Sequence, residues 1–65
     1  MTTQAEYILR LPEVRKRTGL SRSSIYAFMK EGKFPPSTRL GQRSIGWAAS
    51  TIDAWIAERI QASAE

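Results

Sequence analysis

The chain has 65 residues, no cysteine and no histidine, and a formal net charge of +4 from ten lysines and arginines against six acidic residues. A chain of this length builds one domain, whose folding hides only about 60% of the surface that the unfolded chain exposes. Cysteine and histidine are the usual zinc ligands and the usual partners of a catalytic nucleophile, so their absence predicts no metal site, no cofactor and no enzyme activity. The sequence also shows no apolar run long enough to span a membrane and no secretory signal, which predicts a cytoplasmic protein without membrane contact.

The basic residues are concentrated in the middle of the chain. Nine of the ten lie between Arg10 and Arg43, where Glu13 and Glu31 are the only acidic residues, whereas the part from Ile45 onward has three acids and one base. A one-sided basic surface attracts polyanions such as nucleic acids. The same charges also fit an ordinary solvated surface, so charge leaves both interpretations open.

The first ten residues carry no helix signal. Residues 1–6 are polar and we expect them to be disordered, ahead of one domain over residues 7–65. Tyr7–Arg10 is typical of a short extended segment.

A first helix is predicted over about Pro12–Arg17. Proline suits the first helical turn because its missing N–H has no partner there in any case. This helix would bury Leu11 and Val14, and Gly19 is placed to end it in the left-handed conformation.

A second helix is predicted from Arg22 to about Glu31, with Ser21 as its N-cap. Its apolar residues follow the i, i+3, i+4 spacing of one buried stripe, formed by Ile25, Phe28 and Met29. Gly32 and the prolines that follow it stop the helix.

Two short helices joined by a turn that contains glycine fit a helix-turn-helix, whose second helix lies in the major groove of DNA. The side chains of this helix that we expect at DNA are those of Ser21, Arg22, Ser23, Ser24, Ala27 and Lys30. The guanidinium of Arg22 has the geometry to bind O6 and N7 of a guanine. The alternative is that Ser21 only caps the helix and Arg22 is only solvated.

A β-hairpin is predicted from Thr38–Leu40 and Ser44–Trp47, turning at Gly41–Gln42. Such a hairpin can form a basic wing on the DNA backbone or in the adjacent minor groove, where narrow grooves attract arginine. The wing residues that we expect at DNA are Arg39, Gln42, Arg43 and Ser44. The alternative is an exposed hairpin whose charges keep the protein soluble.

A last helix is predicted from Thr51, with Ser50 as its N-cap and Asp53 completing an approximate capping box. We expect it to bury Ile52, Trp55, Ile56 and Ile60. The predicted fold is therefore mostly α with a small β-hairpin, a winged helix-turn-helix with three helices. Its expected core comprises Leu11, Val14, Leu20, Ile25, Phe28, Met29, Phe34, Leu40, Trp47, Ile52, Trp55 and Ile56.

Spaced motifs run through nearly the whole chain: Leu9-Arg10-Leu11-Pro12-Glu13-Val14, Thr18 to Tyr26, Gly32-Lys33-Phe34-Pro35-Pro36, Leu40-Gly41, Trp47, and Ile52 to Ile56. In these motifs the chain resembles the AlpA family of phage and prophage regulators. The resemblance implies a winged helix-turn-helix related to excisionases and to the DNA-binding domains of MerR-type regulators. It also implies a transcriptional regulator, or a factor that helps excise prophages by bending DNA.

The resemblance places the reading helix at Ser21–Lys30 and the wing at Arg39–Arg43. Tyr26 matches an aromatic residue that related domains can turn toward the DNA backbone, and a partly buried packing role is the alternative. Trp47 and Trp55 match core positions. The chain departs from the family's pattern in having small, uncharged residues where basic or polar ones are frequent, at Gly46, Ala48 and Ala49.

The leading hypothesis is a sequence-specific, double-stranded DNA-binding transcriptional regulator. The alternatives are an excisionase and a protein-interaction adaptor with the same fold. Besides DNA, the partners to consider are a second copy of the chain on an adjacent half-site, an integrase and RNA polymerase.

Overall fold

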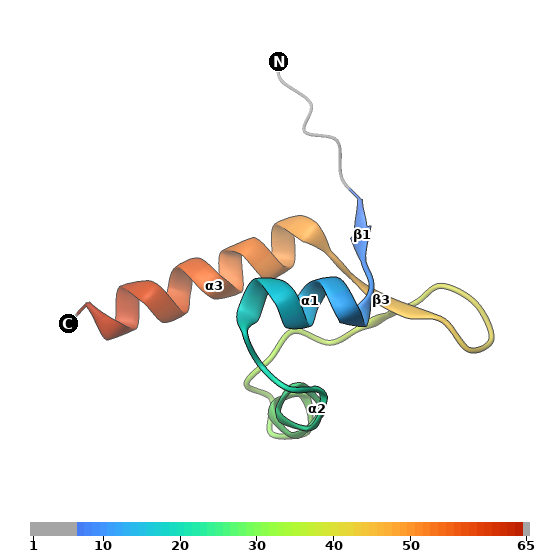
Figure 1. The fold of residues 1–65 in the computed structure, drawn as a ribbon, viewed down its shortest axis with the longest axis horizontal. Coiled ribbons are helices and arrows are strands. Elements are labelled where there is room, and N and C mark those ends of the chain that lie inside the picture. The colour runs from blue at the N-terminus through green and yellow to red at the C-terminus, as the bar shows by residue number, and fades with distance from the viewer. Residues whose placement is uncertain (1–6, 65) are drawn as a thin grey trace, which may run out of the picture.

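Residues 7–64, the part of the chain that the computed structural model describes, form three helices and three short strands. In chain order these are β1 (Ile8–Leu9), α1 (Leu11–Thr18), α2 (Arg22–Lys30), β2 (Thr38–Arg39), β3 (Ile45–Ala48) and α3 (Ala49–Ser63). The predicted fold, mostly α with a small β-hairpin, is confirmed (Figure 1). The disordered segment predicted at residues 1–6 lies outside the described residues.

The three strands form an antiparallel sheet in the order β1-β3-β2. The β2–β3 hairpin was predicted, whereas the pairing of β1 with β3 was not. In that pairing Ile8 lies opposite Ala48 and Leu9 lies opposite Trp47. Gly46 makes the close approach of β1 possible, because a Cβ at this position would lie 2.9 Å from the Leu9 carbonyl oxygen and would meet the Ile8 side chain.

The core lies between the sheet and the three helices. Its buried residues are Leu9, Val14, Ile25, Phe34, Trp47, Ala49 and Ile52, and the half-buried residues packed against them are Leu11, Leu20, Phe28, Met29, Ile45, Trp55 and Ile56. The core is therefore largely the predicted one, with Leu9 added because β1 pairs with β3.

Two residues predicted to be buried are exposed. Leu40 is 44% exposed because it follows β2, on the part of the hairpin that projects from the body of the protein. Ile60 is 65% exposed because the second half of α3 extends past the sheet and the other helices (Figure 1).

The predicted start of the last helix was also wrong. The helix begins at Ala49, and Ala48, whose side chain has no hydrogen-bonding group, occupies the N-cap position that was assigned to Ser50. The reason is that α3 continues directly from β3: the Ala49 N–H donates to the Tyr7 carbonyl at 2.9 Å, which carries the β1–β3 pairing into the first residue of the helix.

Aromatic residues fasten the loop between α2 and β2 to the rest of the core. The Phe34 ring meets the rings of Trp47 and Trp55 edge-on, with centroids 6.2 and 4.8 Å away. Trp47 Nε1 donates to the Pro35 carbonyl at 3.0 Å, and Trp55 Nε1 donates to the Lys33 carbonyl at 2.9 Å. These contacts fix the end of α2 relative to β3 and α3.

None of the described helices combines the length and the apolar character that a membrane span requires.

Candidate nucleic-acid interface

The turn between α1 and α2 is ordered by local hydrogen bonds. Gly19 ends α1 in the left-handed conformation (φ 76°), as predicted, and its N–H donates to the Arg15 carbonyl at 2.8 Å. The Thr18 hydroxyl donates to the Val14 carbonyl at 2.8 Å and accepts from the Leu20 N–H at 3.2 Å. With the half-buried Leu20 packed against the core, this turn fixes the position at which α2 begins.

Two of the predicted site residues have structural roles at the start of α2. Ser21 is the N-cap, as predicted, and its Oγ accepts from the Ser24 N–H at 3.1 Å. The Ser21 hydroxyl also lies 3.1 Å from the Ser24 hydroxyl, to which it donates, and Ser24 is half-buried. The other two residues of this turn, Arg22 and Ser23, are exposed.

The exposed side of α2 carries the remaining predicted residues. Arg22, Ser23, Tyr26, Ala27 and Lys30 are all exposed and lie away from the apolar stripe that faces the core. The Arg22 guanidinium carbon lies 5.7 Å from the centroid of the Tyr26 ring, one helical turn along. This cation–π geometry favours an Arg22 side chain that lies along the helix over the Tyr26 ring.

The first turn of α2 contains no acidic residue. No carboxylate of that turn therefore neutralises the positive end of the helix dipole or its free N–H groups. An anion such as a phosphate is favoured at this position.

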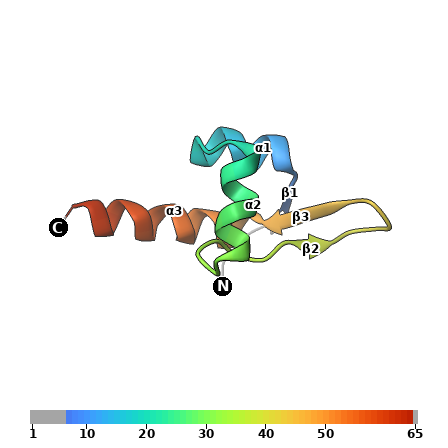
Figure 2. The same cartoon turned by 90° about the horizontal axis from the view of Figure 1, so that it is seen from below.

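The hairpin forms the predicted wing, and it projects to one side of α2 (Figure 2). Its loop is closed by two hydrogen bonds, from the Leu40 and Gly41 N–H groups to the Ser44 carbonyl, at 2.7 and 3.3 Å. The side chains of Arg39, Gln42 and Arg43 are exposed, whereas Ser44 is half-buried. The structure thus brings the predicted residues into two groups, one on α2 and one on the wing.

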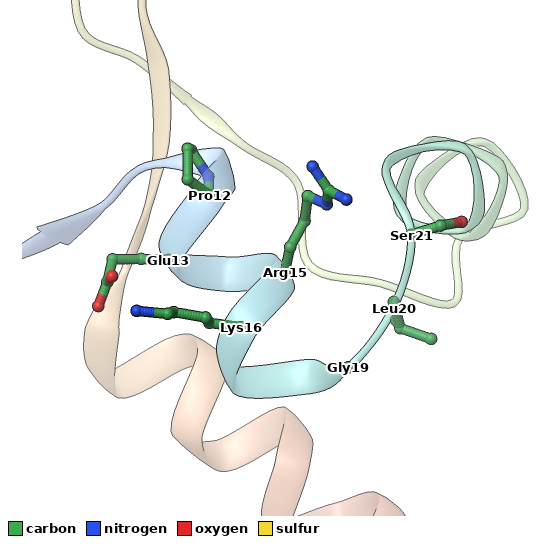
Figure 3. Close-up of a pocket in the computed structure, with 7 residues that line it drawn as sticks. All are labelled: Pro12, Glu13, Arg15, Lys16, Gly19, Leu20 and Ser21. Atoms are coloured by element: carbon green, nitrogen blue, oxygen red, sulfur yellow. The ribbon is translucent and has the colours of Figure 1, made fainter.

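Basic residues of α1 adjoin the start of α2, and sequence reasoning did not select them. Arg15 and Lys16 line an open depression together with Ser21 and the turn (Figure 3). Figure 3 shows the Arg15 side chain pointing between the start of α1 and the start of α2, whereas Lys16 points toward Glu13. The run of three basic residues in the last turn of α1 was the signal that could have identified them.

Arg17, the third residue of that run, belongs to the supporting structure. Its guanidinium donates to the Tyr7 hydroxyl at 2.9 Å and to the Asp53 carboxylate at 3.0 Å, so it joins α1 to α3 and to the residue that precedes β1. The hydrogen bond to Tyr7, together with the Asp53 charge, raises the pKa of Arg17 above its ordinary value. Lys33 lies 3.6 Å from Glu31. Among the described residues, Arg17 and Lys33 therefore form ion pairs with carboxylates.

The small residues after the wing face the interior. Gly46 and Ala49 are buried and Ala48 is half-buried. These positions belong to the packing of β3 and the start of α3, and not to the exposed surface of the wing.

Comparison with known proteins identifies the family. The family model described as "Prophage CP4-57 regulatory protein (AlpA)" matches residues 7–60. The chain belongs to the AlpA family. The match covers all the elements described above except the end of α3.

Two curated relatives of this AlpA-family chain show the similarity in detail. One is an uncharacterised protein, ORF88, of Enterobacteria phage P4, 47% identical over 55 residues that cover 85% of this chain and 62% of that protein. The aligned part is thus less than two thirds of the phage protein. The other is the DNA-binding transcriptional activator AlpA of Escherichia coli K12, 38% identical over 58 residues that cover 80% of this chain and 83% of that protein. No solved structure shows a significant match.

Proposed function

We propose that this AlpA-family chain binds double-stranded DNA sequence-specifically and acts as a transcriptional regulator of the phage and prophage type. In this proposal residues 7–65 are one DNA-binding domain. Helix α2 lies in the major groove, and the wing lies on the backbone or in the adjacent minor groove. The observation that carries the proposal is the exposed side of α2, where Arg22 lies over Tyr26 next to a helix start without acidic residues.

Each exposed residue of α2 has a role in this arrangement. Arg22 donates to O6 and N7 of a guanine, the commonest specific contact in the major groove. Ser23 and Ala27 are small, which lets the helix approach the base edges, and Lys30 binds a phosphate. Ser21 acts through the cap that it forms with Ser24, which orients the first N–H groups of α2 toward a phosphate.

The wing supplies contacts that do not depend on base identity. Arg39, Gln42 and Arg43 bind phosphate or sugar oxygens, or enter the minor groove, on one side of the α2 site. Ser44 acts through its backbone carbonyl, which closes the loop. The basic residue Arg15 on α1 adds a phosphate contact on the other side of the turn.

The named relative favours transcription over the alternatives. The Escherichia coli protein is a DNA-binding transcriptional activator by name, and it is aligned over 80% of this chain. Regulation of transcription through DNA binding therefore has more support than excision, an adaptor role without DNA, or enzyme activity.

The test is selection of bound duplexes from a random pool at moderate salt, followed by sequencing. A single module of this size buries roughly 600–1,000 Å² on DNA, so we expect the best sites to hold two copies at half-sites about 10 bp apart. A recovered motif with this repeat supports the proposal. Retention of no duplex even at low salt would overturn it and favour the adaptor.

A further inference from the structure

Arg10 connects the start of the helix-turn-helix to the wing. It lies between β1 and α1, and its Nε donates to the carbonyl of Ile45 on β3 at 3.1 Å, across 35 residues of the chain. The Arg10 side chain is exposed, as is that of Ile8 in β1. This hydrogen bond joins the body of the protein to the strand that runs out into the wing.

The sheet shows why this hydrogen bond falls at Ile45. Strand β1 ends at Leu9, opposite Trp47, and the chain then turns into α1. Among the described residues, Ile45 pairs with Arg39 of β2 and has no partner on β1, so this part of the chain has three strands near the core and two in the wing. The Arg10 guanidinium supplies a donor on the side of β3 that β1 no longer reaches.

A two-stranded hairpin is marginally stable by itself and needs a third strand or packing to hold one conformation. Between Ile45 and the tip of the wing, the Leu40 and Gly41 N–H groups donate to the Ser44 carbonyl. These two hydrogen bonds close the loop but do not connect it to the helices. The direction of the wing relative to α1 therefore depends on the contacts at its base, which are the packing of half-buried Ile45 against the core and the hydrogen bond from Arg10 to the Ile45 carbonyl.

We infer that Arg10 is the positioning residue of the wing: it fixes the direction of the hairpin relative to α1, and thereby relative to α2. The inference rests on the proposed function, since it explains how the wing arginines and Arg22 reach one duplex at the same time. A wing held in advance in its bound direction loses less conformational freedom on binding. Arg10 thus contributes to DNA binding through Arg39 and Arg43.

The first measurement needs no DNA. Amide hydrogen exchange of the free protein compares the wild type with Arg10→Met, which keeps a long side chain and removes the donor. The matched control is Arg59→Met, which removes the same charge from α3. We expect the Leu40 and Gly41 amides to exchange at least about tenfold faster in Arg10→Met, while the Ile25 amide of α2 stays unchanged, because local opening of the hairpin leaves the core intact.

The second measurement uses the duplex selected for the wild type, at saturating protein. Dimethyl sulfate reports guanine N7 under α2, and hydroxyl radicals report the sugar-phosphate backbone under the wing. We expect Arg10→Met to keep the guanine protection and to lose the protection under the wing. A double-mutant cycle compares the fold loss of DNA affinity caused by each substitution. The fold loss caused by Arg43→Ala should be at least about threefold smaller in the Arg10→Met background, whereas the fold loss caused by Arg22→Ala should stay the same.

Several results would overturn the inference. These are unchanged exchange at Leu40 and Gly41, equal acceleration at Ile25, or independent effects of Arg10→Met and Arg43→Ala with an intact wing footprint. The last result would make Arg10 a plain phosphate contact. If the wild type protects no duplex, the proposed function fails, and the exchange experiment still decides whether Arg10 holds the wing.

Discussion

Helices α2 and α3 divide their surfaces between protein and solvent in different ways. Helix α2 has nine residues, of which Ile25 is buried, and Phe28 and Met29 continue the apolar stripe against the core toward the end of the helix. Helix α3 has fifteen residues, but its buried residues are Ala49 and Ile52 in the first two turns, and the described residues from Ala57 onward are exposed. Helix α2 is therefore packed from its second turn to its C-terminal end, whereas α3 is packed in its first half.

Their charges differ as well. The exposed side of α2 carries only neutral and positive residues, whereas α3 carries Asp53 and Glu58 beside Arg59. The comparison shows that α2 packs its apolar stripe on the core and exposes a cationic side, whereas the first half of α3 contributes Ala49, Ile52, Trp55 and Ile56 to that core. The following predictions test this difference, beginning with the largest expected effect.

Two substitutions within α3 separate its anchored half from its exposed half. Ile52→Ala should lower the free energy of unfolding by about 2–5 kcal/mol, because it leaves a cavity at a fully buried side chain. Ile60→Ala should change it by less than about 0.5 kcal/mol, because that side chain is 65% exposed. Thermal and urea unfolding followed by circular dichroism measure both. Equal decreases in the free energy of unfolding for the two variants would mean that the end of α3 is also packed in solution.

Arg22→Ala removes the proposed guanine contact of α2. It should cost about 1–3 kcal/mol of binding free energy on the best duplex and relax the base preference at one position. Titration of the selected duplex and of single-base variants measures this.

Tyr26 offers a test of how Arg22 is held. Tyr26→Phe keeps the ring beneath the guanidinium, so base preference should be retained, whereas Tyr26→Leu should weaken discrimination by about 0.5–1 kcal/mol. If Tyr26→Phe instead weakens all duplexes equally, the hydroxyl contacts the DNA backbone and the ring is not the support of Arg22.

Ser21→Ala removes the cap of α2. The free energy of unfolding should fall by about 0.5–2 kcal/mol, because the Ser24 N–H loses its acceptor. Ser23→Ala is the matched control in the same turn, and it should change stability by less than about 0.5 kcal/mol. A larger loss at Ser23 than at Ser21 would contradict the capping geometry.

Arg43→Ala on the wing is compared with Arg59→Ala on α3, to test which of the two residues contacts DNA. Loss of one phosphate contact should reduce the log–log dependence of affinity on salt by about 0.9 for every duplex. Arg59→Ala on α3 removes an equal charge and should leave that slope unchanged. Equal slopes for the two variants would remove Arg43 from the interface.

Much of the architecture follows from local signals in the sequence. Glycine after α1 and serine before α2 place the turn correctly, because a left-handed residue and a side-chain acceptor satisfy backbone groups within a few residues. The spacing of Ile25, Phe28 and Met29 identifies the buried side of α2, and by difference its exposed side. These signals identified the candidate residues on α2, and the hairpin pattern around Gly41–Gln42 identified those on the wing.

Other features depend on contacts between residues far apart in the chain, and the local pattern could not specify them. Ser50 resembles an N-cap, yet the pairing of Tyr7 with Ala49 starts α3 earlier. Arg17 was counted with the basic surface, but Asp53 and Tyr7 hold it against the supporting elements.

The distance along the chain between interacting residues separates the features that the sequence predicts from those that only the tertiary structure decides. Helix periodicity and capping involve hydrogen bonds that span four residues or fewer, so the sequence predicts them well. Burial of Leu9, exposure of Ile60 and the contact from Arg10 to Ile45 arise only when strands and helices pack, because each depends on which distant segment fills the adjacent space.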